Sequence, residues 1–360
     1  MILLNPGPVT LTARVRAALL EPDLCHRSEE FSVLLDTLCR GIESVHARAH
    51  DETAPMRAVL LSGSGTLAVE SMLDSFVAAD ERIVVVANGV YGERIASMLQ
   101  ARAIRHTVVR SAWTEDIDWE SLDVALRAGG VRYVVAVHHE TTTGRLNDLA
   151  RLLALCESLG AGVLLDAVSS FGAESISVSH PALCAIAGTA NKCLHGVPGV
   201  AFVLARPVLL APDGSHARSV YLDLSRYDQA RHDHAVPFTP AMQSCFALRA
   251  ALVELHDDGG WHRRRARYLT LSTRLRDALR DCKLSTVVPE TACASMLTAW
   301  YLPPRVSYDD LDATMTSAGF TIYPGQGAFR GRVLRLATMG HISDHDMDRL
   351  IPLLVSTLDA

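Results

Sequence analysis

The sequence predicts an α/β protein whose large domain holds a mostly parallel sheet of the seven-stranded type, followed by a small α+β domain. Two observations predict this fold. Short apolar, β-branched runs alternate with helical patterns, as in a sheet with helical crossovers. The runs are continuously apolar rather than alternating, which indicates strands covered by helices on both faces. A chain of 360 residues is long enough for a second domain.

The elements of the large domain follow in order. The strand expected at 57–63 leads into the helical pattern "TLAVESMLDSFV", and the strand at 82–89 leads into "YGERIASMLQARA". A strand at 131–140 precedes a helix at 148–160. Three further strands are expected at 162–168, 182–188 and 199–205. Ligands of such sheets bind beyond the carboxyl ends of the strands, so the polar residues at those ends are the candidates for a site.

The pattern changes near residue 282. It then predicts a strand, a helix, two strands and a helix, at 294–302, 308–319, 320–325, 332–337 and 344–358. A helix at 261–280 is expected to connect the two parts, with its basic stretch at 262–268 facing solvent. The predicted organisation is an N-terminal segment, 1–15, that packs with the small domain, a large domain, 16–260, and a small domain, 261–360.

Composition limits the classes of function. With a formal net charge of −6 and no basic run interleaved with aromatic residues, the chain is not expected to bind nucleic acid. No apolar stretch approaches the ~18 residues of a membrane span, and the N-terminus breaks too early, at Pro6, for a signal peptide. The eight cysteines are scattered without a CxxC pair, which favours a reducing compartment. We therefore expect a cytoplasmic protein that does not enter a membrane.

The stretch "SGSGTLAVE" at 62–70 follows a strand and opens a helix. Gly63 and Gly65 allow the backbone to come close to a ligand, and the hydroxyls of Ser64 and Thr66 join the first free N–H groups of the helix in a seat for phosphate. The same residues match the dinucleotide-binding pattern, but that pattern expects an acid at the end of the next strand, and "VANGVYG" has none. A phosphate seat is favoured, and a dinucleotide site and a plain turn are the alternatives.

Two further strand ends, an aromatic residue and one lysine extend the pattern. Asp166 ends the apolar run "GVLLDAV", where a buried carboxylate needs a cationic partner; an ion-paired structural aspartate is the alternative. "HHETTTG" at 138–144 brings three hydroxyls and Tyr91 offers a flat ring, although a turn and a core position would also explain them. Lys192 stands in "GTANKCLHGVPG" at 188–199. Together these features indicate a pyridoxal 5′-phosphate (PLP) site, in which Lys192 forms the Schiff base and the aspartate keeps the ring nitrogen protonated.

Seven blocks of the chain resemble, in order, the class V aminotransferases of fold type I, and most closely the branch that transfers the amino group of 2-aminoethylphosphonate to pyruvate. The blocks are "LLNPGPVT", "SGSGTLAVE", "NGVYGER", "ETTTG", "DAVSSFG", "ANKCLHGVPG" and "IYPG". The resemblance implies PLP as cofactor, an aminophosphonate and a 2-oxo acid as substrates, phosphonoacetaldehyde and alanine as products, and a homodimer with shared active sites. An alanine– or serine–glyoxylate aminotransferase on the same scaffold is the alternative, and an NAD-dependent oxidoreductase is a remote one.

The resemblance also implies a role for each candidate residue. Lys192 carries the cofactor and moves the proton, while Asp166 pairs with the ring nitrogen. The cofactor-binding candidates besides these two are Ser64, Gly65, Thr66, Tyr91, Thr141, Val168, Asn191 and Thr239. Thr239 is implied to reach the phosphate of the neighbouring subunit. Arg335 is implied to bind the anionic end of the substrate, for which its planar fork is suited; a surface salt bridge is the alternative for this arginine.

Two departures from the family's pattern leave the exact amino donor open. Gln326 follows "IYPG", where the family typically has lysine, and "RLATMG" stands where the family has a segment similar to "RIGNIG", so residues 336–339 differ. Both departures lie close to where the donor is expected to bind. His26 and Arg27 are further candidates for anion contacts, with a structural role as the alternative.

Overall fold

The central element of the fold is a seven-stranded sheet, seen in a computed structural model that describes residues 1–47 and 56–359. Its strand order is β2-β10-β9-β8-β5-β3-β4. All neighbours run parallel except β10, which is antiparallel to β2 and to β9. The prediction of a mostly parallel sheet is therefore confirmed. The strands are β2 (Arg57–Gly63), β3 (Arg82–Ala87), β4 (His106–Arg110), β5 (Val131–Val137), β8 (Gly162–Asp166), β9 (Leu183–Thr189) and β10 (Gly199–Ala205).

Helices cover both faces of this sheet. On one face Val85, Val135 and Leu164 pack with residues of α3 and α4. On the other face Val84 and Val134 pack with residues of α2, α5, α6 and α8. Successive strand residues point to opposite faces, which explains why the strands are apolar without alternation. The helices are α1 (Ala13–Ala17), α2 (Glu29–Ser44), α3 (Gly65–Phe76), α4 (Val90–Ala101), α5 (Trp119–Arg127), α6 (Leu149–Ser158), α7 (Leu224–His232) and α8 (Met242–Asp257).

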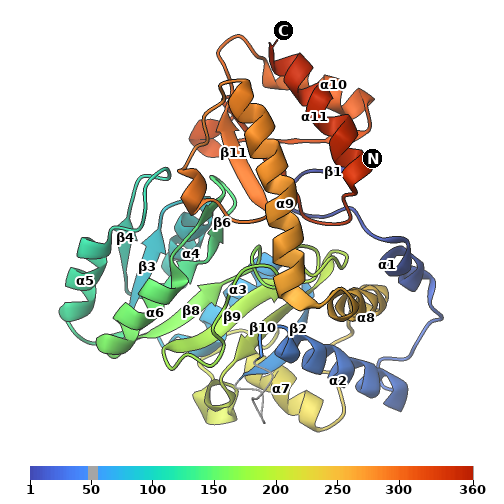
Figure 1. Ribbon diagram of the computed structural model, residues 1–360. Coiled ribbons are helices and arrows are strands. Elements are labelled where there is room, and N and C mark those ends of the chain that lie inside the picture. Colours follow the sequence, from blue (N-terminus) through green and yellow to red (C-terminus); the bar gives the residue numbers. More distant parts are fainter. Residues whose placement is uncertain (48–55, 360) are drawn as a thin grey trace.

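The long helix α9 (Gly260–Asp281) leads from the sheet to the C-terminal residues, which stack above it (Figure 1). A three-stranded sheet of order β11-β14-β13 packs there with two helices. The strands and helices that follow α9 are β11 (Leu297–Tyr301), α10 (Tyr308–Ser317), β12 (Phe320–Thr321), β13 (Tyr323–Pro324), β14 (Val333–Ala337) and α11 (Asp344–Asp359), of which β12 lies outside this sheet. The division of the chain at residue 261 stays a prediction.

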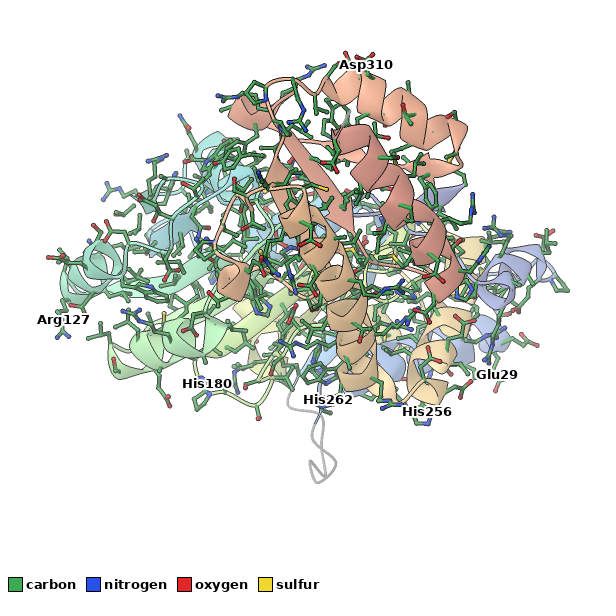
Figure 2. All side chains as sticks on the ribbon, turned by 45° about the horizontal axis from the view of Figure 1, so that its top comes forward. Glu29, Arg127, His180, His256, His262 and Asp310 are labelled. Carbon is green, nitrogen blue, oxygen red and sulfur yellow. The ribbon has the colours of Figure 1, made fainter. Side chains whose placement is uncertain are left out.

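Two details of the sequence prediction were wrong. The single strand expected at 320–325 is split, because β12 pairs with β1 (Ile2–Leu3) and β13 pairs with β14 in a different sheet. The basic stretch of α9 is also not uniformly solvated. Arg264 is buried and its Nη1 donates to the carbonyl of Cys193, 2.8 Å away. Charged side chains that do project from the rim of the molecule include Arg127 and Asp310 (Figure 2).

The starts of the helices differ in how they satisfy their free N–H groups. The N-cap side chains Asp118, Asp148 and Ser307 accept from the N–H three residues later, at the starts of α5, α6 and α10. The N-cap of α4 is Gly89, which has no side chain to do this. Among the described residues, no helix combines the length and the apolar character that crossing a bilayer requires.

Candidate active site

Residues from five strand ends meet at the carboxyl edge of the sheet. Asp166 is the last residue of β8, and Lys192 follows β9. Ser64 follows β2, and Tyr91 lies in the first turn of α4, after β3. Thr141 follows the short strand β6 (His139–Glu140), which pairs with β7 (Arg145–Leu146). The parallel direction of β2, β3, β5, β8 and β9 brings these ends to one edge, as predicted.

The start of α3 offers unpaired donors. Ser64 is the N-cap, its side chain makes no capping bond, and its carbonyl accepts from the N–H groups of Leu67 and Ala68. The N–H groups of Gly65 and Thr66 have no partner among residues 1–47 and 56–359. Gly65 is required because a Cβ there would lie 2.5 Å from Cγ1 of Val168. This helix start therefore fits a phosphate group.

Asp166 is a buried carboxylate without a cation. It is 7% exposed, and its Oδ1 accepts from the N–H of Val168 at 3.0 Å. No lysine, arginine or histidine of the described chain lies within 4.0 Å of its carboxylate. Burial raises the pKa of Asp166 to about 6, against the opposing effect of the Val168 N–H and the charge of Lys192. A protonated ring nitrogen would supply the missing positive partner.

Lys192 is covered by the N-terminal segment. Its Nζ donates to the carbonyl of Pro6, and a Cβ on Gly7 would lie 2.6 Å from its Cδ. Burial lowers the pKa of Lys192 to about 8, against the raising effect of Cys193 and Asp166. With this pKa, about a tenth of the amine is neutral at pH 7, far more than for an ordinary lysine, and the neutral form is what a nucleophile or a base requires.

The neighbours of Lys192 in the sequence are held by hydrogen bonds within the fold. The side-chain oxygen of Asn191 accepts from the hydroxyl of Thr189 at 2.8 Å. Cys193 is buried, and its Sγ contacts the carbonyl of Ser169 at 3.3 Å. These contacts hold the residues on either side of Lys192 in place. A contact of Asn191 with the cofactor stays a prediction.

Several buried polar atoms around Lys192 have no partner in the described part of the chain. They are Oγ1 of Thr141, Nε2 of His139 and Nη2 of Arg335. A buried polar group without a hydrogen bond is costly, so these atoms point to a ligand. His139 was not predicted from the sequence, although it stands beside the hydroxyl residues of "HHETTTG". Burial lowers the pKa of His139 to about 3, so this imidazole is neutral.

Arg335 lies in the middle of β14 and is fully buried. Its Nε donates to the carbonyl of Pro324 at 2.8 Å and its Nη1 to the carbonyl of Thr141 at 2.9 Å. The guanidinium lies 5.0 Å from the ring centroid of Tyr323, its register partner on β13. Its alternative as a surface salt-bridge arginine is wrong, because it is neither exposed nor paired with a carboxylate among the described residues. Burial lowers its pKa.

The remaining candidates are less closely tied to this edge. Thr239 is exposed and lines a cavity with Ser62 and Tyr221, so a reach toward a second subunit stays a prediction. His26 and Arg27 precede α2 and make no side-chain hydrogen bond within the described ranges. The Oε1 atom of Gln326, which follows β13, is buried and has no hydrogen-bond partner among the described residues.

The comparisons with known proteins agree with this geometry. The family model described as "Aminotransferase class-V" matches residues 53–324. A 2-aminoethylphosphonate–pyruvate transaminase of Aeromonas hydrophila is 32% identical, with 95% of this chain and 91% of the relative covered. The protein of the same name from Burkholderia thailandensis is 33% identical, with 96% and 93% covered.

Solved structures give the same fold. An aspartate aminotransferase of Thermus thermophilus superposes with a TM-score of 0.88 at 25% identity, covering 100% of this chain and 99% of that one. A pyridoxamine–pyruvate aminotransferase of Mesorhizobium loti superposes with a TM-score of 0.90 at 22% identity, covering 100% and 92%. The fold is therefore that of the fold type I aminotransferases, as the sequence predicted.

The residues present fit PLP, the cofactor of this family. The free N–H groups of Gly65 and Thr66 match its phosphate, the carboxylate of Asp166, unpaired among the described residues, matches its ring nitrogen, and the half-buried amine of Lys192 matches its aldehyde. The orphaned hydroxyl of Thr141 is a further polar group on the same edge.

Proposed function

The chain belongs to the class V aminotransferases, and from that premise we propose that it transfers the amino group of 2-aminoethylphosphonate, or of a closely related aminophosphonate, to pyruvate. The products are phosphonoacetaldehyde and alanine. The observation that carries the choice of donor is Arg335, a fully buried cation whose Nη2 has no hydrogen-bond partner within residues 1–47 and 56–359. An anionic substrate would supply the negatively charged hydrogen-bond acceptor for this guanidinium. The names of the relatives support the same donor.

PLP, when bound, supplies an aldehyde that condenses with amines and a protonated ring that draws electrons from the bond being broken. Lys192 would hold it through a Schiff base, Ser64, Gly65 and Thr66 would hold its phosphate, and Asp166 would keep its ring nitrogen protonated. The Nζ of Lys192 would serve as the base that takes the proton from the carbon bearing the amino group of the donor, and the same Nζ would return a proton to complete the transfer.

The protein excludes water from this step with its N-terminal segment. Pro6 and Gly7 lie directly against Lys192, and low solvent access lowers the pKa of its amine. Arg335 fixes the anionic end of the donor, which orients the reacting carbon toward Nζ. The same groups serve the second half-reaction with pyruvate, so we expect ping-pong kinetics.

Two wider properties belong to the same proposal. A homodimer in which Thr239 reaches the neighbouring subunit's phosphate is supported by the exposure of Thr239 beside the carboxyl edge. A reducing compartment, the cytoplasm, is supported by eight cysteines that are all free. Sedimentation of the purified protein and exchange between inactive subunits (Lys192→Ala mixed with Thr239→Ala) test the shared site.

The donor is tested with a panel of amines and acceptors. We expect 2-aminoethylphosphonate with pyruvate to give the highest kcat/KM, and its uncharged diethyl ester to be worse by about 100-fold or more. Equal or better turnover of serine with glyoxylate would replace the phosphonate assignment by the glyoxylate branch. A protein that develops no borohydride-reducible visible absorption with PLP would refute the cofactor and the whole proposal.

A further inference from the structure

Helix α4 begins without a side chain of its own to cap it, and another strand supplies the cap. The carboxylate of Glu140, at the end of β6, accepts from the N–H groups of Tyr91 and Gly92, with Oε2 at 3.2 and 3.3 Å. The hydroxyl of Thr142 accepts from the N–H of Val90 at 3.2 Å and donates to Oε1 of Glu140 at 2.8 Å. Three of the free N–H groups at this helix start are therefore satisfied by the segment 140–142.

Gly89 and Glu140 occupy one space between them. A Cβ on Gly89 would lie 2.1 Å from Cδ of Glu140. The φ of Gly89 is 178°, which is extended backbone that any residue adopts. The glycine is thus required by the volume of Glu140 and not by backbone strain. The side chain that caps α4 therefore belongs to Glu140, 51 positions after the N-cap residue Gly89.

Glu140 is unusual for a buried carboxylate. It is fully buried and has no cation within 4.0 Å among the described residues. Burial raises its pKa to about 7, although the hydroxyl of Thr142 and the N–H groups of Tyr91 and Gly92 oppose this. The cost of burying this group is offset by hydrogen bonds from a helix N-terminus, a favourable place for a carboxylate.

The segment 140–142 also contacts Arg335, the predicted anion-binding residue. The carbonyl of Thr141 accepts from Nη1 of Arg335 at 2.9 Å. One short segment therefore connects the backbone of Tyr91, the predicted stacking residue, with Arg335, the predicted anion-binding residue. Neither contact involves a reacting atom, so the segment acts by placing both groups.

We propose that Glu140 is a positioning residue that sets the place of Tyr91 against the cofactor ring by capping α4 from β6. The inference rests on the proposed function only in taking PLP as the ligand and Tyr91 as the residue that stacks on it. It does not depend on which amine is the donor.

The hydrogen bonds and the charge make different predictions for Glu140→Gln. Glutamine can keep its carbonyl oxygen toward the N–H groups of Tyr91 and Gly92 and turn its amide toward the hydroxyl of Thr142, which still has acceptor capacity. Glutamine therefore preserves the cap and removes the charge. We expect Glu140→Gln to keep the PLP dissociation constant within about threefold of wild type, and Glu140→Ala to raise it roughly ten- to a hundredfold.

The experiment measures three quantities on the full chain titrated with PLP: the dissociation constant, the visible circular dichroism of the bound cofactor, and hydrogen exchange of the amides at residues 90–92. Glu140→Ala is expected to raise the dissociation constant, reduce the circular dichroism and speed the exchange of these amides. Tyr91→Ala is expected to raise the dissociation constant and reduce the circular dichroism. If Glu140 acts through Tyr91, the double variant is no worse in the dissociation constant than the more damaging single variant. Additive effects would overturn the proposal.

A local cap tests the same point by rescue. In Glu140→Ala the volume around Gly89 is free, so Gly89→Ser in that background restores an N-cap side chain. We expect the double variant to regain amide protection, circular dichroism and most of the PLP affinity. Recovered protection without recovered circular dichroism would overturn the proposal, because Glu140 would then act on the ligand itself.

The matched control is Asp74→Asn. Asp74 is also a fully buried carboxylate that accepts from two backbone N–H groups, but in the second half of α3. It is expected to change the melting temperature and leave the cofactor's circular dichroism unchanged. A wild-type protein without a cofactor signal would refute the proposed function, whereas a wild-type signal that Glu140→Ala leaves intact would refute only this inference.

Discussion

Asp74 and Asp166 are both buried aspartates, and the protein surrounds them in opposite ways. Asp74, within α3, forms an ion pair with Arg102, and two backbone N–H groups donate to it as well. Asp166, at the end of β8, accepts a hydrogen bond from Val168 and has no ion-pair partner among the described residues. The carboxylate of Asp74 has a cationic partner within the fold, and the carboxylate of Asp166 has none among the described residues.

The difference extends to the regions around them. Near α2 and α7, Arg231 pairs with Glu43 at 2.8 Å and with Asp36 at 2.9 Å. At the carboxyl edge of the sheet, four ionisable residues have no ion pair within the described chain. Three of them, Glu140, Asp166 and Arg335, are buried, and the fourth, Lys192, is half-buried. An unpaired buried charge costs free energy, so its repeated occurrence at one edge marks the place where a charged ligand completes the structure.

The largest expected effect separates the two lysines of the chain, Lys192 and Lys283. Lys192→Ala removes the amine that we propose holds the cofactor and moves the proton, so transamination is expected to fall by about 10⁴-fold or more. The borohydride-reducible absorption should disappear with it. Lys283→Ala, on the exposed surface, serves as the control and should leave both unchanged. Residual labelling of the first variant at Lys283 with normal turnover would contradict the assignment.

The next effect contrasts an unpaired with a paired arginine. Arg335→Lys keeps a buried charge but removes the fork and its bonds to two carbonyls, so kcat/KM for 2-aminoethylphosphonate is expected to fall about 100-fold. Arg231→Lys keeps the charge between its two carboxylates and should leave kcat/KM unchanged. Steady-state kinetics on both variants check this. Equal losses in the two variants would erase the proposed distinction between the regions.

A smaller effect concerns the stability of the cofactor-free protein. The pKa of Asp166 is raised from 3.8 to about 6, so the folded state binds this proton more tightly than the unfolded state. Stability therefore falls as the pH rises from about 4 to 6, and the cost stays in place above that range. Asp166→Asn should raise the free energy of unfolding at pH 8 by about 1–3 kcal/mol and leave it unchanged near pH 3.

Asp74→Asn gives the opposite sign at pH 8, because it breaks an ion pair that the fold already has. Urea unfolding of the three proteins at both pH values measures these differences. A loss of stability in Asp166→Asn at pH 8 would show that the carboxylate is satisfied within the protein.

The smallest effect is the titration of Lys192 in the cofactor-free protein. Because its pKa is lowered from 10.5 to about 8, the rate of labelling by an amine-reactive reagent should rise about tenfold between pH 7 and pH 9 and then level off. An amine of ordinary pKa would keep rising by about a hundredfold over the same interval. Peptide mapping of the labelled residue follows the rate for Lys192 alone.

The sequence predicted well what depends on local pattern. The buried strands β5, β8, β9 and β10 were recognisable because they are continuously apolar. The edge strand β4 was missed, because Val109 is the single buried residue of His106–Arg110 and the run is short. The split of 320–325 into β12 and β13 was also hidden, since it depends on pairing with β1, far away in the chain.

The same limit applies to the site. Lys192, Asp166 and the start of α3 were chosen as candidates because each stands at a strand end with an unusual residue type, and the structure brings them to one edge of the sheet. Glu140 was overlooked beside the hydroxyls of "ETTTG", because its role depends on a helix that begins 50 residues earlier. The contact of Pro6 with Lys192 joins residues 186 positions apart, and a pattern of neighbouring residues in the sequence cannot predict a contact over that distance.

The N-terminal cover of Lys192 has a consequence for the order in which the protein is made. Pro6 follows β1, whose partner is β12, with Leu3 opposite Thr321. Because synthesis proceeds from the N-terminus, the first strand must wait until residue 321 has left the ribosome. During that interval the amine of Lys192 lacks the contact with Pro6. Ribosome-bound chains that end before β12 should accordingly react with a soluble aldehyde at Lys192 faster than chains that extend beyond it.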